Sequence, residues 1–170
     1  KKAEPLFNRA LEIRKKALGG DHPDTAISLN NLANLYNNQG LYSKAQVLHL
    51  RALEISEKAL GADHPDTAIS LNNLANLYNN QGLYNKAEPL LNRALEIYEQ
   101  TLGADHPKTA TSLNNLALLY QYQDLYNKAE PLLNRALEIS EKALGADHSL
   151  TATSLNNLAL LYQYQGLYNK

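Results

Sequence analysis

Apolar residues recur along the chain three and four positions apart, and short clusters of glycine, aspartate, histidine and proline separate these runs. That spacing places the apolar side chains on one face of a helix. It predicts an all-α chain of eight helices, since each run is long enough for several helical turns. The predicted helices cover residues 1–18, 23–39, 43–60, 65–81, 85–102, 107–123, 127–144 and 149–165.

The helices repeat in pairs, because the whole pattern returns every 42 residues: His22, His64, His106 and His148 mark the same point of each copy. A fixed period of this length is the signature of a repeat array, in which each unit packs against its neighbours. We expect a single array over residues 1–170. It divides into an unpaired second helix (1–20), three complete repeats (21–62, 63–104, 105–146) and the first helix of a fourth (147–170). The chain begins within a repeat, which suggests that it was cut from a longer array.

Helix boundaries are marked by glycine and proline. Proline is favoured in the first turn of a helix, and Asp21 or His22 is the expected cap before Pro23. Glycine is expected just past helix ends, where the chain turns left-handed; Asp124 replaces it once, at a cost of up to about 1 kcal/mol. Pro89 and Pro131 are expected at the end of the first turn of their helices, where each removes at most one hydrogen bond.

Composition narrows the possible functions. The formal net charge is -1 and the pI is near 6.6. The chain therefore lacks the excess of basic residues expected of a protein that binds nucleic acid or an anionic membrane. No apolar run reaches the length of about 18 residues that a membrane span requires. The chain has no cysteine, which fits a reducing compartment, and we expect a cytoplasmic protein.

The paired positions resemble the tetratricopeptide repeat family. The resemblance lies in Leu32-Ala33 with Tyr36, followed by Gly40, Tyr42, Ala45 and Ala52. The family's usual period is roughly 34 residues, and the extra residues here lengthen the second helix. The longer unit, with its Gly-Ala-Asp-His-Pro junction and Leu-Asn-Asn-Leu-Ala core, is similar to the kinesin-light-chain subclass. The resemblance implies a right-handed superhelical solenoid of antiparallel helix pairs, with the first helices lining a concave groove that binds peptides.

The resemblance assigns the groove to one face of each first helix, which is rich in asparagine. Asparagine is a poor helix former, costing roughly 0.7 kcal/mol against alanine, and its amide can pair with the backbone of an extended ligand. The alternative is that these side chains only solvate the face. The predicted groove residues are Asn30, Asn31, Asn34, Asn38, Asn72, Asn73, Asn76, Asn80, Asn114, Asn115, Leu118, Tyr122, Asn156, Asn157, Leu160 and Tyr164. The resemblance also places Ile27, Asn37, Ile69, Asn79, Thr111, Gln121, Thr153 and Gln163 along the groove.

The groove is graded along the chain. Leu118, Tyr122, Leu160 and Tyr164 replace asparagines in the third and fourth copies, so a ligand's apolar side chains are expected toward the C-terminal half. The matching positions carry no lysine, which argues against a clamp for a terminal carboxylate.

The sequence also bears on functions other than peptide binding. The repeated histidines come from different copies, on the order of 10 Å apart, too far to share a zinc ion. No catalytic motif is present, so we expect no enzyme, metal or cofactor. A structural spacer, or a rod formed by head-to-tail self-association through the open ends, remains the main alternative; a regulatory fragment of an enzyme is a third.

Overall fold

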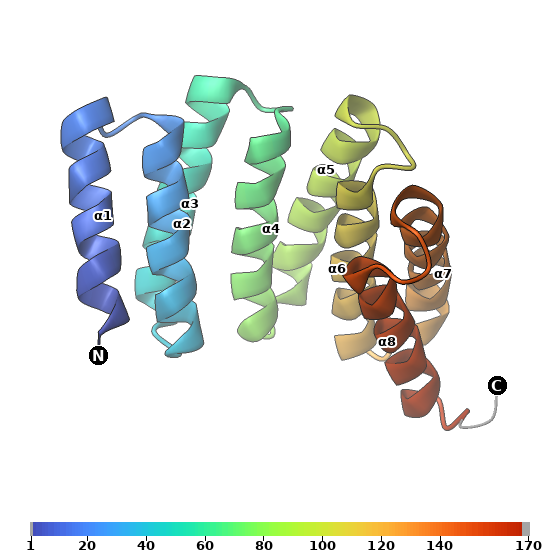
Figure 1. Ribbon diagram of the computed structural model, residues 1–170. Coiled ribbons are helices and arrows are strands. Elements are labelled where there is room, and N and C mark those ends of the chain that lie inside the picture. Colours follow the sequence, from blue (N-terminus) through green and yellow to red (C-terminus); the bar gives the residue numbers. More distant parts are fainter. Residues whose placement is uncertain (1, 168–170) are drawn as a thin grey trace. The chain divides into compact units, whose positions relative to one another are not determined.

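The computed structural model describes residues 2–167, and within them the chain is all α-helix (Figure 1). Residues 168–170, where a further second helix was expected to begin, lie outside this part. The helices fall within a few residues of their predicted bounds. They are α1 (Ala3–Leu18), α2 (Pro23–Asn38), α3 (Tyr42–Leu60), α4 (Pro65–Asn80), α5 (Tyr84–Thr101), α6 (Pro107–Tyr122), α7 (Tyr126–Leu144) and α8 (Ser149–Tyr164).

Histidine side chains cap the first helices, α2, α4, α6 and α8. Nδ1 of His22 accepts a hydrogen bond of 3.1 Å from the backbone N–H of Asp24, and His64, His106 and His148 repeat the contact. A side-chain acceptor at this point satisfies one of the backbone donors left open at a helix start. The cap is therefore histidine, and the carboxylate of Asp21 instead forms an ion pair with Arg51.

Asp124 adopts the left-handed conformation that was predicted for it, with φ of 58°. Gly40, Gly82 and Gly166 hold the corresponding position at φ near 70°. The prediction for the prolines needs a correction. Because α7 begins at Tyr126, Pro131 lies inside the helix, beyond the first turn, and Pro89 lies in the same way inside α5.

The chain forms two compact units, residues 1–90 and 91–170, with the boundary inside α5. In the first unit α2 packs on α1, α3 and α4, and α3 packs on α4; in the second, α7 packs on α6 and α8. Small alanines let the helices approach closely, since Ala33, Ala45 and Ala52 are fully buried beside larger residues such as Ile55.

Some residues of the predicted apolar stripes are exposed. Leu6 and Ile13 of α1 are 67% and 56% exposed, although the corresponding residues of α3 are half-buried (Leu48) and 1% exposed (Ile55). Helix α3 packs against both α2 and α4, whereas α1 packs against α2 within its unit. One face of α1 is therefore open. Ala59, near the end of α3, is also exposed.

Candidate functional site

Exposed positions form one continuous stripe on each first helix of the N-terminal unit. On α2 the stripe follows Ile27, Asn31, Asn34 and Asn38, which are exposed or half-buried and lie three or four residues apart. On α4 it follows Ile69, Asn73, Asn76 and Asn80. We call these eight residues the first-helix stripe. These residues are among the predicted groove positions, and peptide binding by them stays a prediction.

Asn30 does not belong to this stripe, and its predicted place in the groove is wrong. Its side chain is only 6% exposed. Its Nδ2 donates to Oγ of Ser70 on α4 at 3.1 Å. Its Oδ1 accepts from Nδ1 of His49 on α3 at 2.8 Å. One residue along a helix turns the side chain by about 100°, which carries it from the open face at Asn31 into the α2–α4 contact.

The corresponding residues of the other copies differ in where their side chains lie. Asn72 is half-buried and donates to the backbone carbonyl of Ala68 at 3.0 Å. Asn114 of α6 donates to Oγ of Ser154 on α8 at 3.0 Å and accepts from Asn157 at 3.4 Å. Asn156 is exposed on α8. The column was predicted as a ligand surface, yet Asn30 and Asn114 connect successive first helices.

A second amide contact links α2 and α4. Nδ2 of Asn37 donates to Oδ1 of Asn76, and Nδ2 of Asn80 donates to Oδ1 of Asn37, each at 3.2 Å. Asn37 is only 6% exposed, and Gln121 of α6 is 7% exposed, so their expected places in the groove are also wrong. Asn76 and Asn80 remain exposed, but they already use part of their hydrogen-bonding capacity within the protein.

The remaining asparagines of the stripe are available to a ligand. In residues 2–167, no hydrogen bond engages the side-chain amides of Asn31, Asn34, Asn38 or Asn73. Each amide offers two donors and one acceptor. Over the described residues, the stripe therefore contains asparagines whose amides link the helices and asparagines whose amides make no hydrogen bond.

The C-terminal unit presents a more apolar stripe on its first helices. Tyr122 on α6 is 55% exposed, and Leu160 and Tyr164 on α8 are 44% and 63% exposed. Leu118, Asn115 and Asn157 are half-buried. Large exposed side chains of this kind contribute most to protein interfaces, so the grading seen in the sequence is retained on the surface.

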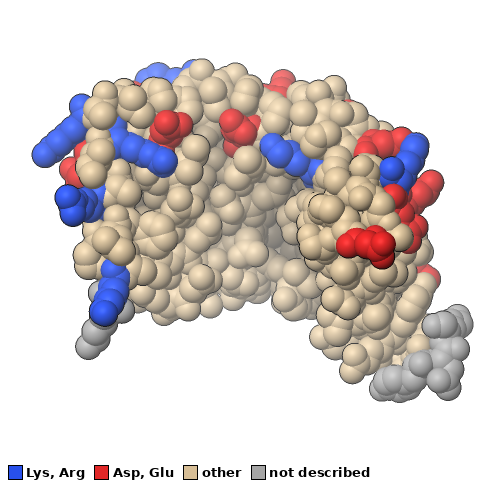
Figure 2. Space-filling model, viewed as in Figure 1, with Lys and Arg blue, Asp and Glu red and all other residues tan. Residues whose placement is uncertain are grey.

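Charged residues are nearly absent from the first helices. Asp24 is the only one on α2, Asp66 the only one on α4 and Lys108 the only one on α6, while α8 has none. In Figure 2 the surface over α2 and α4 carries acidic atoms near one end of these helices, and basic atoms reach the same end of α2. A ligand on the first-helix stripe would therefore meet amides and aliphatic groups rather than charges.

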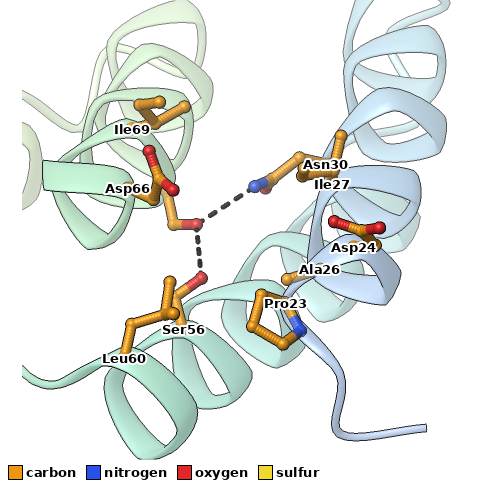
Figure 3. Close-up of a pocket in the computed structure, with 10 residues that line it drawn as sticks. Pro23, Asp24, Ala26, Ile27, Asn30, Ser56, Leu60, Asp66 and Ile69 are labelled. Carbon is orange, nitrogen blue, oxygen red and sulfur yellow. Dashed lines mark hydrogen bonds between the residues drawn. The ribbon is translucent and has the colours of Figure 1, made fainter. Parts of the chain in front are cut away.

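A pocket opens between α2 and α4, above the end of α3 (Figure 3). Its volume is about 130 Å³. Aliphatic groups of Ala26, Ile27, Leu60 and Ile69 line it, together with the buried polar groups of Asn30, Ser56 and Ser70 and the acidic residues Asp24 and Asp66. Sequence reasoning missed this pocket, because its lining residues come from three helices and only their packing brings them together.

The described residues offer no group of three or more His, Cys, Asp or Glu side chains arranged to hold a metal ion. The repeated histidines each cap their own helix, and His49 is fully buried. None of the helices in the described part of the chain is both long enough and apolar enough to cross a membrane.

The chain is a helical repeat solenoid, the architecture of protein-interaction scaffolds. Its helices are paired with a 42-residue period, small residues lie at their contacts, and the first helices have an open face. The tetratricopeptide repeat model matches residues 1–48, 28–100, 69–142 and 114–170. The chain belongs to the tetratricopeptide repeat family, and its array is of the kinesin-light-chain type.

Solved structures agree with this assignment. BtubC (BKLC) from P. vanneervenii is 28% identical, with a TM-score of 0.81 over 98% of this chain and 66% of its own. The nearly identical TPR-like repeats of a putative kinesin light chain from Podosopora anserina are 30% identical, with a TM-score of 0.77 over 97% of this chain and 78% of their own. RapI in its apo form, at 23% identity and a TM-score of 0.74, shares the fold. No curated protein sequence matches the chain.

Proposed function

We propose that the chain is a protein-interaction module that binds extended peptide segments along the exposed stripes of its first helices. The observation that carries this proposal is the group of unengaged amides of Asn31, Asn34, Asn38 and Asn73. They lie on helices where asparagine opposes the local propensity. No hydrogen bond of their side chains within residues 2–167 explains them.

The amides suit the backbone of an extended peptide. A peptide group has one donor and one acceptor, and an asparagine amide can satisfy both. Recognition of this kind depends little on ligand side chains, and the absence of charge along the stripe favours a neutral segment. The C-terminal unit, with Tyr122, Leu160 and Tyr164, would take apolar side chains. No catalytic step is part of the proposal.

A peptide-display selection tests the proposal. The parent chain is compared with an N31A/N34A/N73A variant, which removes three unengaged amides and raises helix propensity, so folding should be retained. The matched control is N92A/N127A/N134A, because these three asparagines are exposed on the second helices α5 and α7. We expect peptides that enrich on the parent and the control to be lost on the stripe variant. Equal enrichment on all three proteins would refute the proposal.

Self-association is a second candidate function. Leu155 and Leu160 of α8 are 47% and 44% exposed, and Leu6 and Ile13 of α1 are 67% and 56% exposed. Inner first and second helices pack the same residue types together, so the two surfaces could join copies head to tail. Light scattering over a concentration series tests this: growth of the mass with concentration supports a rod, and a constant monomer mass rejects it.

A further inference from the structure

We propose that the pocket between α2, α3 and α4 receives one lysine side chain of the bound peptide. The proposal rests on the peptide-binding function and gives it a chemical preference. A lysine side chain combines a flexible aliphatic stem with a terminal ammonium group. The pocket offers a complementary surface to each of these parts.

The pocket has the size and shape for a single side chain. Its volume of about 130 Å³ is below the range of about 300–1,000 Å³ typical of pockets for whole small molecules. Ile27 and Ile69, which are 50% and 41% exposed, flank it from α2 and α4. Figure 3 places them on the two helices that border the pocket, with Leu60 of α3 below. An aliphatic stem would bury apolar surface against all three.

The charge at the pocket is negative. Asp24 and Asp66 each precede the isoleucine of their own helix by three residues, so each carboxylate lies one turn from it on the same side. The lining contains no lysine or arginine. Arg14 reaches Asp24 only at its backbone carbonyl, at 3.0 Å, and no ion pair within residues 2–167 engages the Asp24 carboxylate. The Asp66 carboxylate lies 4.0 Å from the ring of His64.

The interior of the pocket also favours a hydrogen-bond donor. The Asn30 amide donates to Ser70 at 3.1 Å, and the hydroxyls of Ser70 and Ser56 lie 3.2 Å apart. Ser56 donates to the carbonyl of Ala52 at 3.0 Å, so Ser70 must be the donor to Ser56. A carbonyl or hydroxyl oxygen accepts through two lone pairs. Oγ of Ser70 uses one in its contact with Asn30, and Oδ1 of Asn30 uses one in its contact with His49. An ammonium group could bond the other lone pair of either oxygen.

The same combination of residues does not recur at the aligned positions of the later repeats. Tyr98 stands where Ser56 stands in the first repeat, and its side chain is buried. Lys108 and Leu150 stand where Asp24 and Asp66 border the pocket. An acidic, polar-floored pocket is thus particular to the first pair of repeats, and a lysine bound there would fix the position of the peptide on the array.

Methyl NMR of the isoleucines tests the pocket directly, with N-acetyl-lysine N-methylamide as the probe. The norleucine analogue has the same stem length without the charge. We expect the lysine probe to shift the methyl signals of Ile27 and Ile69, and the norleucine probe to bind more weakly. In a D24N/D66N variant we expect the affinity to fall about fivefold, because each exposed charge contact contributes a fraction of a kilocalorie. An E138Q/E141Q variant, which loses two exposed carboxylates of α7, should bind as the parent does.

Three results would overturn the proposal: no shift at Ile27 and Ile69, equal binding of the two probes, or unchanged affinity in D24N/D66N. Inorganic phosphate is a further probe, and its binding at these isoleucines would show that the pocket selects anions instead.

The outcome of the lysine titration is separate from that of the peptide selection. If peptides without lysine enrich on the parent and the lysine probe shifts no methyl signal, the lysine pocket is rejected and the peptide-binding function is kept. A positive lysine titration with no enriched peptide would keep the lysine preference of the pocket and reject the peptide-binding function.

Discussion

The imidazole of His49 donates through Nδ1 to Oδ1 of Asn30, 2.8 Å away, in a fully enclosed contact between α3 and α2. Nε2 of the same ring is buried and makes no hydrogen bond. Burial lowers the pKa of His49 to about 4, from the ordinary value of 6.5. The neutral ring fits the interior, and a protonated ring would add a charge that no neighbouring group balances.

Acid should therefore weaken the fold through His49. The folded pKa is depressed, so the neutral ring contributes its full stability above pH 6.5, and this contribution is lost as the pH falls from 6.5 toward 4. The loss amounts to at most about 3 kcal/mol, from about 1.4 kcal/mol per unit of pKa difference. Denaturant unfolding at a series of pH values measures it.

The H49L variant is the control for this acid effect, because leucine stands at the corresponding positions 91 and 133. We expect the free energy of unfolding of H49L to fall less between pH 6.5 and 4 than that of the parent. Parallel pH profiles for the two proteins would show that His49 does not titrate in this way.

The two kinds of asparagine should differ in their effect on stability. N37A removes both amide bonds that Asn37 makes with Asn76 and Asn80, and we expect a loss of about 1–3 kcal/mol. N31A removes no such bond and replaces a poor helix former, so a gain of about 0.5 kcal/mol is expected. Denaturant midpoints compare the variants. Equal destabilisation by both would contradict the division into structural and available amides.

The histidine caps should each contribute measurably. H64A removes the acceptor for the backbone N–H of Asp66 at the start of α4, and the expected cost is about 1 kcal/mol. H64N retains a side-chain acceptor and should recover most of the loss. Thermal unfolding of the two variants beside the parent measures both effects. If H64N were as unstable as H64A, the hydrogen bond would not be the source of the stability.

Asp124 offers a site for stabilisation. It holds φ of 58° without the freedom of glycine, and D124G should relieve strain worth up to about 1 kcal/mol. The change also removes the exposed contact in which the hydroxyl of Tyr126 donates to Asp124 at 2.6 Å, which offsets part of the gain. The reciprocal G82D should destabilise. A lower unfolding midpoint for D124G would mean that the Tyr126 contact outweighs the strain.

The helices could be predicted closely from the sequence, because their signals are local. The 42-residue period, the proline at helix starts and the glycine at helix ends place every boundary within a few residues. The left-handed Asp124 followed from alignment with Gly40 and Gly82. These features depend on neighbouring residues and on comparison among copies of one unit.

Which asparagines are buried and which are exposed could not be predicted in the same way. Asn30 and Asn31 are adjacent, and the same dipeptide recurs in every copy, yet one is buried and the other exposed. Which of them turns inward depends on where α4 lies beside α2. The partner of Asn30 also depends on His49, and the two later repeats carry leucine at that position, Leu91 and Leu133. The pocket between α2, α3 and α4 arises from the same packing.

The most direct test of the peptide-binding face is the response of the side-chain amide NMR signals to a peptide obtained from the display selection. We expect the amide signals of Asn31, Asn34 and Asn73 to shift on titration, while those of Asn92, Asn127 and Asn134 on the second helices stay in place. Shifts confined to the second helices, with the stripe signals unmoved, would contradict the account.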